Sequence, residues 1–353
     1  MRESSVAKAG RAPDPEAPGE PEAPTQIPRA SWRYIIVRSG QEFLWDDCMQ
    51  IAAALTYYAV LSLFPALLAV VAVLGLVGKA KTVTDAVLSA IGQLAPGPAV
   101  DLLRGPVHEL ATSEAAGLAL VVGVLGALWS ASAYVRAFGR AVNRVYEVDE
   151  GRPFWRLVPT TLAVTVLGVA IAAVMSATLA LSGGVARAVG NAFGVAHAAE
   201  AVWSVAKWPV LVALAIVAVS VLYYVTPNVR RPKFRWVSIG AAVALALAAL
   251  ATTGFAFYVA NFAHYNKTYG AIGSVIILLI WVWIVNLALL FGAEFDSEVE
   301  RGRQLQAGIR AERAIQLPPR DDRQSVRRAA REEKAVARGR ELRERLAAGR
   351  AAR

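Results

Sequence analysis

Hydroxyl and amide side chains that stand inside long apolar runs are the residues of this sequence that could do chemistry. They are Thr56, Tyr57, Tyr58, Ser130 and Asn286. Polar groups at membrane depth are costly, so each is a candidate for binding the polar part of a ligand. The alternative is that each forms an interhelical hydrogen bond that only fixes helix packing.

Charged candidates lie at the ends of these runs. Arg136 follows the second run and Glu294 follows the sixth. There a charged side chain can contact a substrate, or it can form an ion pair that anchors a helix. Strongly ionisable residues are nearly absent from the middle of the runs, which disfavours a carrier driven by a buried central carboxylate. An inward-opening cavity lined by aromatic and hydroxyl groups would suit an amphiphile.

The histidines and the cysteine do not have the spacing of a catalytic or metal site. His108, His197 and His264 are far apart, and Cys48 is the only cysteine, so no zinc ligand set is present. The sequence has no P-loop, dinucleotide-binding fingerprint, His-Glu-x-x-His run or nucleophile elbow. We therefore predict a protein that is not an enzyme and that uses no cofactor and no metal.

Six long apolar segments position the candidate residues. Hydrophobic residues make up 56% of the 353 residues and charged residues 18%, a balance too apolar for a soluble domain of this size. A helix needs about 20 apolar residues to cross the hydrocarbon core of a bilayer. The segments are 51–77, 117–135, 157–181, 208–225, 236–262 and 272–293. The prediction is an all-α membrane protein, a bundle of about six transmembrane helices.

The remaining sequence divides around this membrane domain, which we place at residues 31–300. A leader at 1–30, rich in Pro, Ala and Glu, is predicted to be disordered. Residues Trp32–Asp47 favour a helix at the inner membrane interface, or alternatively the start of the first span. Residues Lys81–Thr112 have apolar residues at helical spacing and predict an extracytoplasmic helical hairpin. A charged tail at 301–353 is expected to be helical or disordered.

The distribution of charge predicts the topology. If the N-terminus is cytoplasmic, 31 of the 37 Lys and Arg residues fall on the cytoplasmic side. This agrees with the positive-inside rule, so we expect both termini in the cytoplasm of a multi-pass protein of the cytoplasmic membrane. The net charge of +10 is then explained by topology and by anionic lipid headgroups, without a nucleic-acid partner.

Small residues and one proline are expected to shape the helix contacts. Pro65 interrupts the first segment and should kink it, because its ring removes a helical hydrogen bond. Two rows of small residues are candidate packing seams, although Ala-rich segments also produce such rows by chance. The rows are Gly123, Ala127 and Ala131, and Gly240, Ala244, Ala248 and Thr252.

Several ordered motifs resemble the YihY/BrkB family of bacterial inner-membrane proteins. They read AALTYY at 53–58, LSLFP at 61–65, AVNRVY at 141–146, YVTPN at 224–228, and YGAIG at 269–273 followed by GAE at 292–294. The resemblance covers approximately Trp32 to Glu300 and adds Asn143 and Asn228 to the candidate residues. Members of that family were once labelled as a ribonuclease, a label since regarded as mistaken, and no settled substrate follows from it.

These observations lead to one functional hypothesis and its alternatives. The leading hypothesis is transport or translocation of a lipid-like or amphiphilic molecule, with Tyr57, Tyr58, Asn143 and Asn286 around one cavity. The alternative is a non-transporting scaffold or regulator that acts through its cytoplasmic tail. Ribonuclease activity is disfavoured. The expected partners are membrane lipids and an amphiphilic substrate, and homo-oligomerisation is left open.

Overall fold

The computed structural model describes residues 5–13, 21, 26–75, 118–180, 196–230, 234–262 and 271–351. Over these residues the chain is helical, with a single isolated β-bridge between Val229 and Pro319. The helices are α1 (Ser5–Arg11), α2 (Arg29–Trp45), α3 (Cys48–Gly75), α6 (Leu118–Val145), α7 (Phe154–Ala180), α9 (Ala196–Val225), α10 (Phe234–Phe262), α12 (Ala271–Gln306) and α13 (Arg323–Ala351).

Each predicted span overlaps one helix, namely α3, α6, α7, α9, α10 or α12, and α6, α9 and α12 extend well beyond the predicted bounds. Within the described residues, four of them are long and apolar enough to cross a membrane, over Phe154–Leu179, Val202–Val225, Ile239–Asn261 and Gly273–Gln306. The apolar part of α3 found in the same way, Cys48–Ser62, is shorter than these four. The protein is therefore an all-helical membrane protein with several apolar helices. The predicted count of six spans goes beyond these four, and the predicted hairpin lies outside the described residues.

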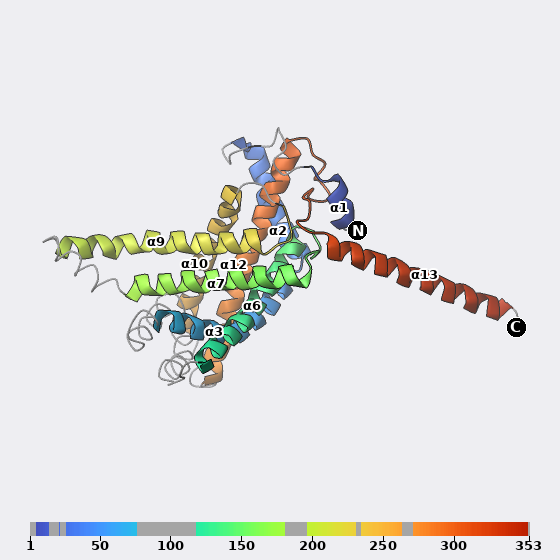
Figure 1. The fold of residues 1–353 in the computed structure, drawn as a ribbon. Coiled ribbons are helices and arrows are strands. Elements are labelled where there is room, and N and C mark those ends of the chain that lie inside the picture. The colour runs from blue at the N-terminus through green and yellow to red at the C-terminus, as the bar shows by residue number, and fades with distance from the viewer. Residues whose placement is uncertain are drawn as a thin grey trace.

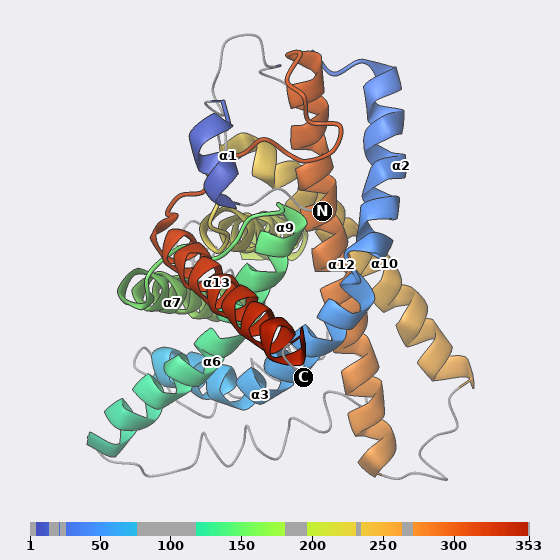
Figure 2. The ribbon, with the colours of Figure 1, turned by 90° about the vertical axis from the view of Figure 1, so that its right-hand side faces the viewer.

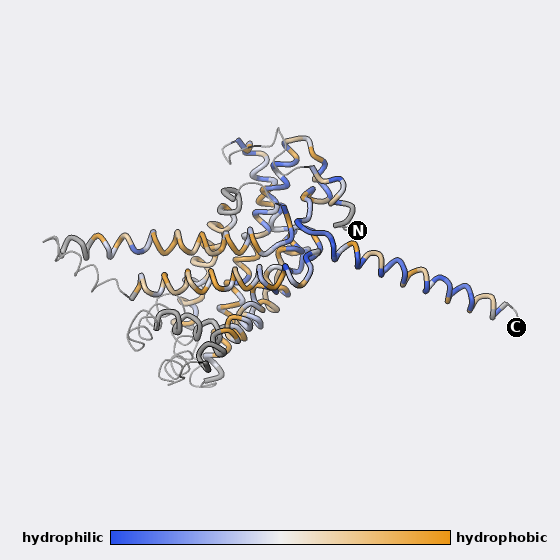
Figure 3. The backbone as a smooth tube through the Cα atoms, viewed as in Figure 1, coloured by the Kyte–Doolittle hydropathy of each residue, from blue (hydrophilic) through white to orange (hydrophobic). Residues whose placement is uncertain are grey.

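The helices form pairs that converge at one end of the molecule. α7 and α9 lie side by side and project from the body toward the same side, whereas α13 leaves the body on the opposite side (Figure 1). α2 runs along the C-terminal half of α12, as the second view shows (Figure 2). Apolar residues line α7 and α9, and polar residues dominate α13 (Figure 3). We call the convergence region, formed by residues 146–153, 226–230 and 307–322, the polar end.

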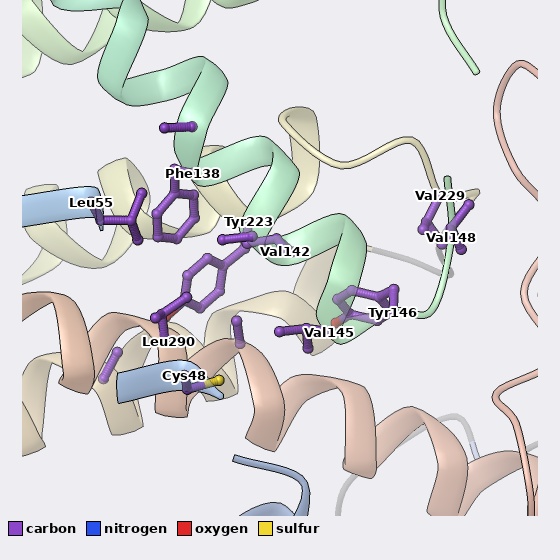
Figure 4. Packing of buried hydrophobic residues seen from close by; sticks show 14 of the residues in the cluster. Cys48, Leu55, Phe138, Val142, Val145, Tyr146, Val148, Tyr223, Val229 and Leu290 are labelled. Atoms are coloured by element: carbon purple, nitrogen blue, oxygen red, sulfur yellow. The ribbon is translucent and has the colours of Figure 1, made fainter. Parts of the chain in front are cut away.

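The core lies where α3, α6, α9 and α12 meet. Phe138 and Tyr223 are fully buried and their rings stack with centroids 6.0 Å apart. Leu55 and Leu290 pack around them from α3 and α12 (Figure 4). Outside this core many large apolar side chains are exposed, such as Val205 and Leu250. Apolar surface of this extent on long helices fits contact with lipid.

One predicted packing seam is confirmed at the crossing of α10 and α12. A Cβ atom at Gly292 would lie 2.6 Å from the Cβ atom of Ala244 and 2.5 Å from the carbonyl oxygen of Gly240. Both distances are too short for real contacts, so only glycine fits here. The backbones of the two helices therefore touch, as expected of small residues at a membrane helix contact. In the other row, Ala127 and Ala131 are buried.

The segment before α3 is a separate helix, so the idea that it is only the start of the first span is wrong. α2 ends at Trp45, and Asp47 adopts a left-handed backbone conformation with φ of 55°. Ile35 of α2 is fully buried, and Trp32 stacks on Phe295 of α12 with ring centroids 6.2 Å apart. The predicted position of α2 at the membrane interface stays a prediction. α3 continues through Pro65 to Gly75, and the kink at Pro65 also stays a prediction.

The N-terminal leader differs from the sequence expectation, whereas the C-terminal tail contains the expected helix, α13, but differs over residues 307–322. Ser5–Arg11 in the expected disordered leader forms α1, where the buried Lys8 ammonium lies 3.3 Å from a Glu147 carboxylate oxygen. At the other end, α12 continues to Gln306 and residues 307–322 fold back against the polar end. A charge-rich sequence is expected to be exposed to solvent. In these terminal regions, however, charged side chains form ion pairs and are buried. The projecting tail begins at Arg323.

Candidate functional site

An apolar groove lies between α3, α6, α7, α9 and α12. Its volume is about 390 Å³, which lies within the range of small-molecule sites. Each helix contributes to the lining, and no charged side chain is among the lining residues. The lining includes Ala59, Ser62, Ala131, Tyr134, Val164, Thr165, Gly168, Ala172, Ala218, Leu222 and Leu289.

The three hydroxyl groups of the groove are already engaged with the protein. Ser62 donates to the carbonyl oxygen of Ser130 at 3.3 Å. Thr165 donates to the carbonyl oxygen of Thr161 at 2.8 Å. Tyr134 donates to the amide oxygen of Asn286 at 2.8 Å. Because these donors are used, the groove presents an almost entirely apolar surface, which fits a hydrocarbon chain.

Two of the candidate residues form a polar link beside this groove. Asn286 is 2% exposed, and besides accepting from Tyr134 it donates to the Thr56 hydroxyl at 3.3 Å. Thr56 in turn donates to the carbonyl oxygen of Ala52 at 2.8 Å. The link therefore joins α3, α6 and α12 by hydrogen bonds. This arrangement matches the packing role that was the alternative reading of both residues.

Other candidates lie away from the groove. Tyr57 is 61% exposed, and its ring meets that of Tyr58 edge to face, with centroids 5.5 Å apart. The backbone carbonyl of Ser130 accepts the bond from Ser62, and Arg136 donates to Ser132 while its guanidinium stacks over the Trp129 ring at 5.5 Å. Adjacent residues of a helix point about 100° apart, so Thr56 and Tyr57 cannot both face inward.

At the polar end, two motif asparagines are joined directly. The side-chain oxygen of Asn143 accepts a hydrogen bond from the backbone N–H of Asn228 at 2.7 Å, and its amide donates to Glu150 at 3.1 Å. Asn143 is 3% exposed and Asn228 is fully buried. This contact ties the end of α6 to the turn after α9. The expectation that Asn143 and Asn286 share one cavity with Tyr57 and Tyr58 is therefore wrong, because the two asparagines belong to separate helix contacts.

The segment that follows α12 closes this polar end. The Asn228 side chain donates to the carbonyl oxygen of Asp321 at 2.7 Å and accepts from its backbone N–H at 3.0 Å. It also donates to the carbonyl oxygen of Asp149 at 3.0 Å. The Asp321 carboxylate pairs with Arg156 at 2.9 Å. One asparagine thereby links three segments that are distant in the sequence.

Two arginines complete this knot, which we define as Asn143, Glu150, Arg152, Asn228, Arg320 and Asp321. Arg152 makes two bonds to the Glu150 carboxylate, at 2.8 and 2.7 Å, and donates to the carbonyl oxygen of Thr226 at 2.5 Å. Arg320 donates to the carbonyl oxygens of Val229 and Tyr224, at 2.8 and 2.6 Å. Carbonyl groups at the end of α9, which lack helical partners, are thus satisfied by guanidinium groups.

A second buried network surrounds the end of α12. Arg301 is 1% exposed and pairs with Glu298 at 2.9 Å and with Glu147 at 3.3 Å. Its third guanidinium nitrogen, Nη1, donates to the carbonyl oxygen of Ala311 at 2.7 Å. Glu294 is also 1% exposed, and it accepts a weak hydrogen bond from the Cys48 thiol at 3.5 Å. The candidate Glu294 is therefore part of the contact between α12 and α3.

Sequence reasoning missed several residues of these sites. Thr165 and Gly168 of the groove and Arg152, Arg320 and Asp321 of the knot were not among the candidates. The pair Pro318-Pro319 was an available signal, because proline ends helices and favours extended backbone of the kind that meets Val229. Within the described residues, no cluster of three or more His, Cys, Asp or Glu side chains could hold a metal ion.

Comparison with known proteins places the chain in a family. The sequence profile described as Virulence factor BrkB matches residues 39–315. A ribonuclease-like protein, YfkH, of Bacillus subtilis is 32% identical over 254 residues, which cover 72% of this chain and 90% of that protein. UPF0761 membrane proteins are also similar. That of Alkalilimnicola ehrlichii is 28% identical over 265 residues, 73% of this chain and 56% of its own length.

Another UPF0761 membrane protein, from Xanthomonas campestris pv. campestris, is 28% identical over 285 residues, 79% of this chain and 62% of its own length. The chain thus spans less than two thirds of these two UPF0761 proteins. No solved structure matches the chain. Since the family profile covers most of the chain, including the groove and much of the polar end, the protein belongs to the virulence factor BrkB family of membrane proteins.

Proposed function

We propose that this protein binds and translocates a lipid-like or amphiphilic molecule, with the groove holding its hydrocarbon part. The observation that carries the proposal is the apolar groove of about 390 Å³ between five helices, lined without a charged side chain. A hydrocarbon chain gains about 0.8 kcal/mol for each methylene that leaves water, but gains nothing of this kind on leaving lipid. Selection of a lipid by the groove therefore depends on shape and close packing.

The proposal includes a membrane topology. The topology has six spans, with the polar end and both termini in the cytoplasm of a bacterial inner membrane. It is supported by the helices that overlap the six predicted spans, four of which are long and apolar enough to cross a membrane, and by the positive-inside charge distribution. Reporter fusions at Arg230 and at the C-terminus should both report a cytoplasmic location. A periplasmic signal at Arg230 would overturn this topology.

Lipid transfer by the reconstituted protein tests the activity. Gly168 lies in the groove, and a Cβ atom built there meets no atom within 4 Å, so a side chain such as that of Gly168→Phe can start from this position without a clash at Cβ. Gly254 on α10 is equally open but is not among the groove residues. Liposomes with the wild-type protein should move labelled envelope lipids between leaflets faster than empty liposomes. Gly168→Phe should reduce transfer to near the empty level, and Gly254→Phe should leave it unchanged.

Two results would contradict the proposal. One is transfer no faster than in empty liposomes for every envelope lipid tested. The other is equal transfer by the wild type and the Gly168→Phe variant, since a filled groove would then have no effect. Circular dichroism and thermal unfolding in detergent check that both variants fold.

A second candidate function, a scaffold or regulator that recruits partners, is favoured by the projecting helix α13. The informative truncation ends the chain at Asp322, because residues 307–321 belong to the fold through the bonds of Ala311, Arg320 and Asp321. A scaffold should lose its cellular phenotype on this truncation, whereas a translocator should keep lipid transfer. The ribonuclease-like name belongs to the B. subtilis relative, and an RNA cleavage assay with divalent metal tests that activity here.

A further inference from the structure

The positive charge of α13 is gathered on one side of the helix. α13 contains ten Lys and Arg residues and four Glu residues, a net charge of +6. Arg327, Arg331, Lys334, Arg338 and Arg345 follow one another at i, i+4, i+7, i+11 and i+18. At about 3.6 residues per turn, this spacing aligns them along one face. All five are exposed.

With the other charged residues of α13 included, the whole net positive charge lies on one half of the helix. Arg323 and Arg328 flank the aligned face, which carries Glu341 as its acidic residue, so this half of the helix has a net charge of +6. The opposite half carries Arg340, Arg343 and Arg350 together with Glu332, Glu333 and Glu344, and has no net charge. We call the charged half the basic face of α13.

Two large apolar side chains lie at the margin of the basic face. Leu342 and Leu346 are one helical turn apart and are 59% and 60% exposed. A row of arginines beside exposed leucines is typical of helices that lie in the headgroup region of an anionic membrane, where the apolar side chains enter the acyl boundary. A nucleic acid would use the arginines but not the leucines.

The rest of the described chain leaves this face uncovered. α13 projects from the body (Figure 1), and its contact with another described helix is a small one with α1. Its start is held by the polar end, where Gln324 donates to the carbonyl oxygen of Gly151 at 2.9 Å. Because its start is anchored in a membrane protein, α13 has a high effective concentration at the bilayer surface, so weak attraction is sufficient to turn the projecting helix onto that surface.

From these observations we propose that the basic face of α13 binds the surface of an anionic phospholipid bilayer. Each Lys or Arg near such a surface contributes about 1 kcal/mol, equal to about a fivefold gain in binding. The helix is about 10–12 Å across, and charge is screened over about 8–10 Å at moderate salt. Charges on the far side of a docked helix are thus strongly screened from the lipid headgroups. A charge on the basic face therefore contributes more to binding than a charge on the opposite half.

The test uses the full chain in lipid nanodiscs with an environment-sensitive fluorophore on α13. Ala335 lies within the basic face and Val336 lies on the opposite half, and both are exposed. Each is replaced by cysteine in a Cys48→Ala background and labelled. In discs containing phosphatidylglycerol, the label at residue 335 should shift to the blue and be quenched by shallow nitroxide lipids. The label at residue 336 should respond much less, and neither label should respond in pure phosphatidylcholine.

Two charge-matched variants separate the face from the net charge. Arg327→Gln, Arg331→Gln and Arg338→Gln together remove three charges from the basic face, and should weaken docking of the 335 label by about a hundredfold. Arg340→Gln, Arg343→Gln and Arg350→Gln remove three charges from the other half, and should weaken it by less than tenfold.

Equal effects of the two variants, or no response to anionic lipid, would overturn the proposal. So would a response in neutral discs to added RNA or to an acidic protein, which would identify a different partner. Because the readout is the position of α13 and not lipid transfer, its outcome is independent of whether the groove translocates lipid.

Discussion

The side-chain amide of Asn228 makes two hydrogen bonds to the backbone of Asp321, accepting from its N–H and donating to its carbonyl oxygen. The two residues are 93 positions apart in the sequence. The bond holds the segment after α12 against the turn after α9, and Asn143 holds the same turn against α6. The arrangement predicts that the polar end unfolds as one unit.

Replacement of Asn228 should therefore lower stability sharply. Asn228→Ala removes three side-chain hydrogen bonds and leaves buried backbone groups unpaired, which should cost about 3 kcal/mol. Asn228→Asp should cost as much or more, because a carboxylate would face the carbonyl oxygens of Asp149 and Asp321 in place of a donor. Thermal unfolding in detergent measures both effects.

Asn261 provides the control for this prediction. It is exposed, and its amide bonds the Phe257 carbonyl one turn earlier in α10. Asn261→Ala should change stability by less than about 0.5 kcal/mol, as surface substitutions do. A stable Asn228→Ala protein would show that the knot does not hold the polar end together.

The hydrogen bond between Tyr134 and Asn286 should contribute modestly to stability, although it lies beside the groove. Hydrogen bonds between membrane helices average about 0.6 kcal/mol in double-mutant cycles. We expect a coupling energy of this size from Tyr134→Phe, Asn286→Ala and the double variant, measured by unfolding in mixed micelles. If Asn286→Ala abolished lipid transfer while stability stayed unchanged, Asn286 would have a role in the substrate path beyond packing.

Closer packing at the crossing of α10 and α12 should not be tolerated. Gly292→Ala places a methyl group against Ala244 and the backbone of Gly240, and should cost at least about 1–3 kcal/mol. Gly254→Ala on α10, where space is open, should be neutral or stabilising by up to about 1 kcal/mol, because alanine favours helix. Equal melting temperatures for the two variants would show that the helices separate easily at this contact.

Loss of Arg301 should be among the most damaging single changes at the polar end. Arg301→Met leaves Glu298 without its buried cationic partner and Glu147 with Lys8 alone, and should cost about 3–5 kcal/mol. Arg313 is exposed, so Arg313→Met should have little effect. Addition of Glu298→Leu to Arg301→Met should restore part of the stability, since it removes one unpaired charge. Chemical denaturation of the three variants measures the difference.

The apolar helices could be predicted from sequence because continuous apolar length is a property of single segments. The seam at Gly240 and Ala244 was also visible, since small residues four apart lie on one face. The groove could not be predicted from the sequence, because a helix that is apolar on all sides gives no sign of which side faces its neighbours. Thr165 and Gly168 of α7 were therefore not singled out, and Tyr57 was placed at the expected cavity although Thr56 is the buried residue.

The polar end was predicted least well, because its contacts join residues with large sequence separation. Asn143 and Asn228 were found through the family motifs, but their direct bond could not be read from the motifs. Arg301, Arg320 and Asp321 lie in a charge-rich stretch that resembles a solvated tail. Their burial depends on partners such as Glu147 and Asn228, and a local composition cannot show partners.

The hydrogen bonds between Asn228 and Asp321 also determine when the polar end can be completed during synthesis of the protein. Translation proceeds from the N-terminus, so α6 and α9 are made and inserted long before Asp321 emerges from the ribosome. Until then the turn that carries Asn228 is held by Asn143 and Asp149 but lacks both of its bonds to Asp321. The polar end of the nascent protein therefore stays incomplete until residue 321 has been made, and premature termination before Asp321 should yield a product that quality-control proteases recognise.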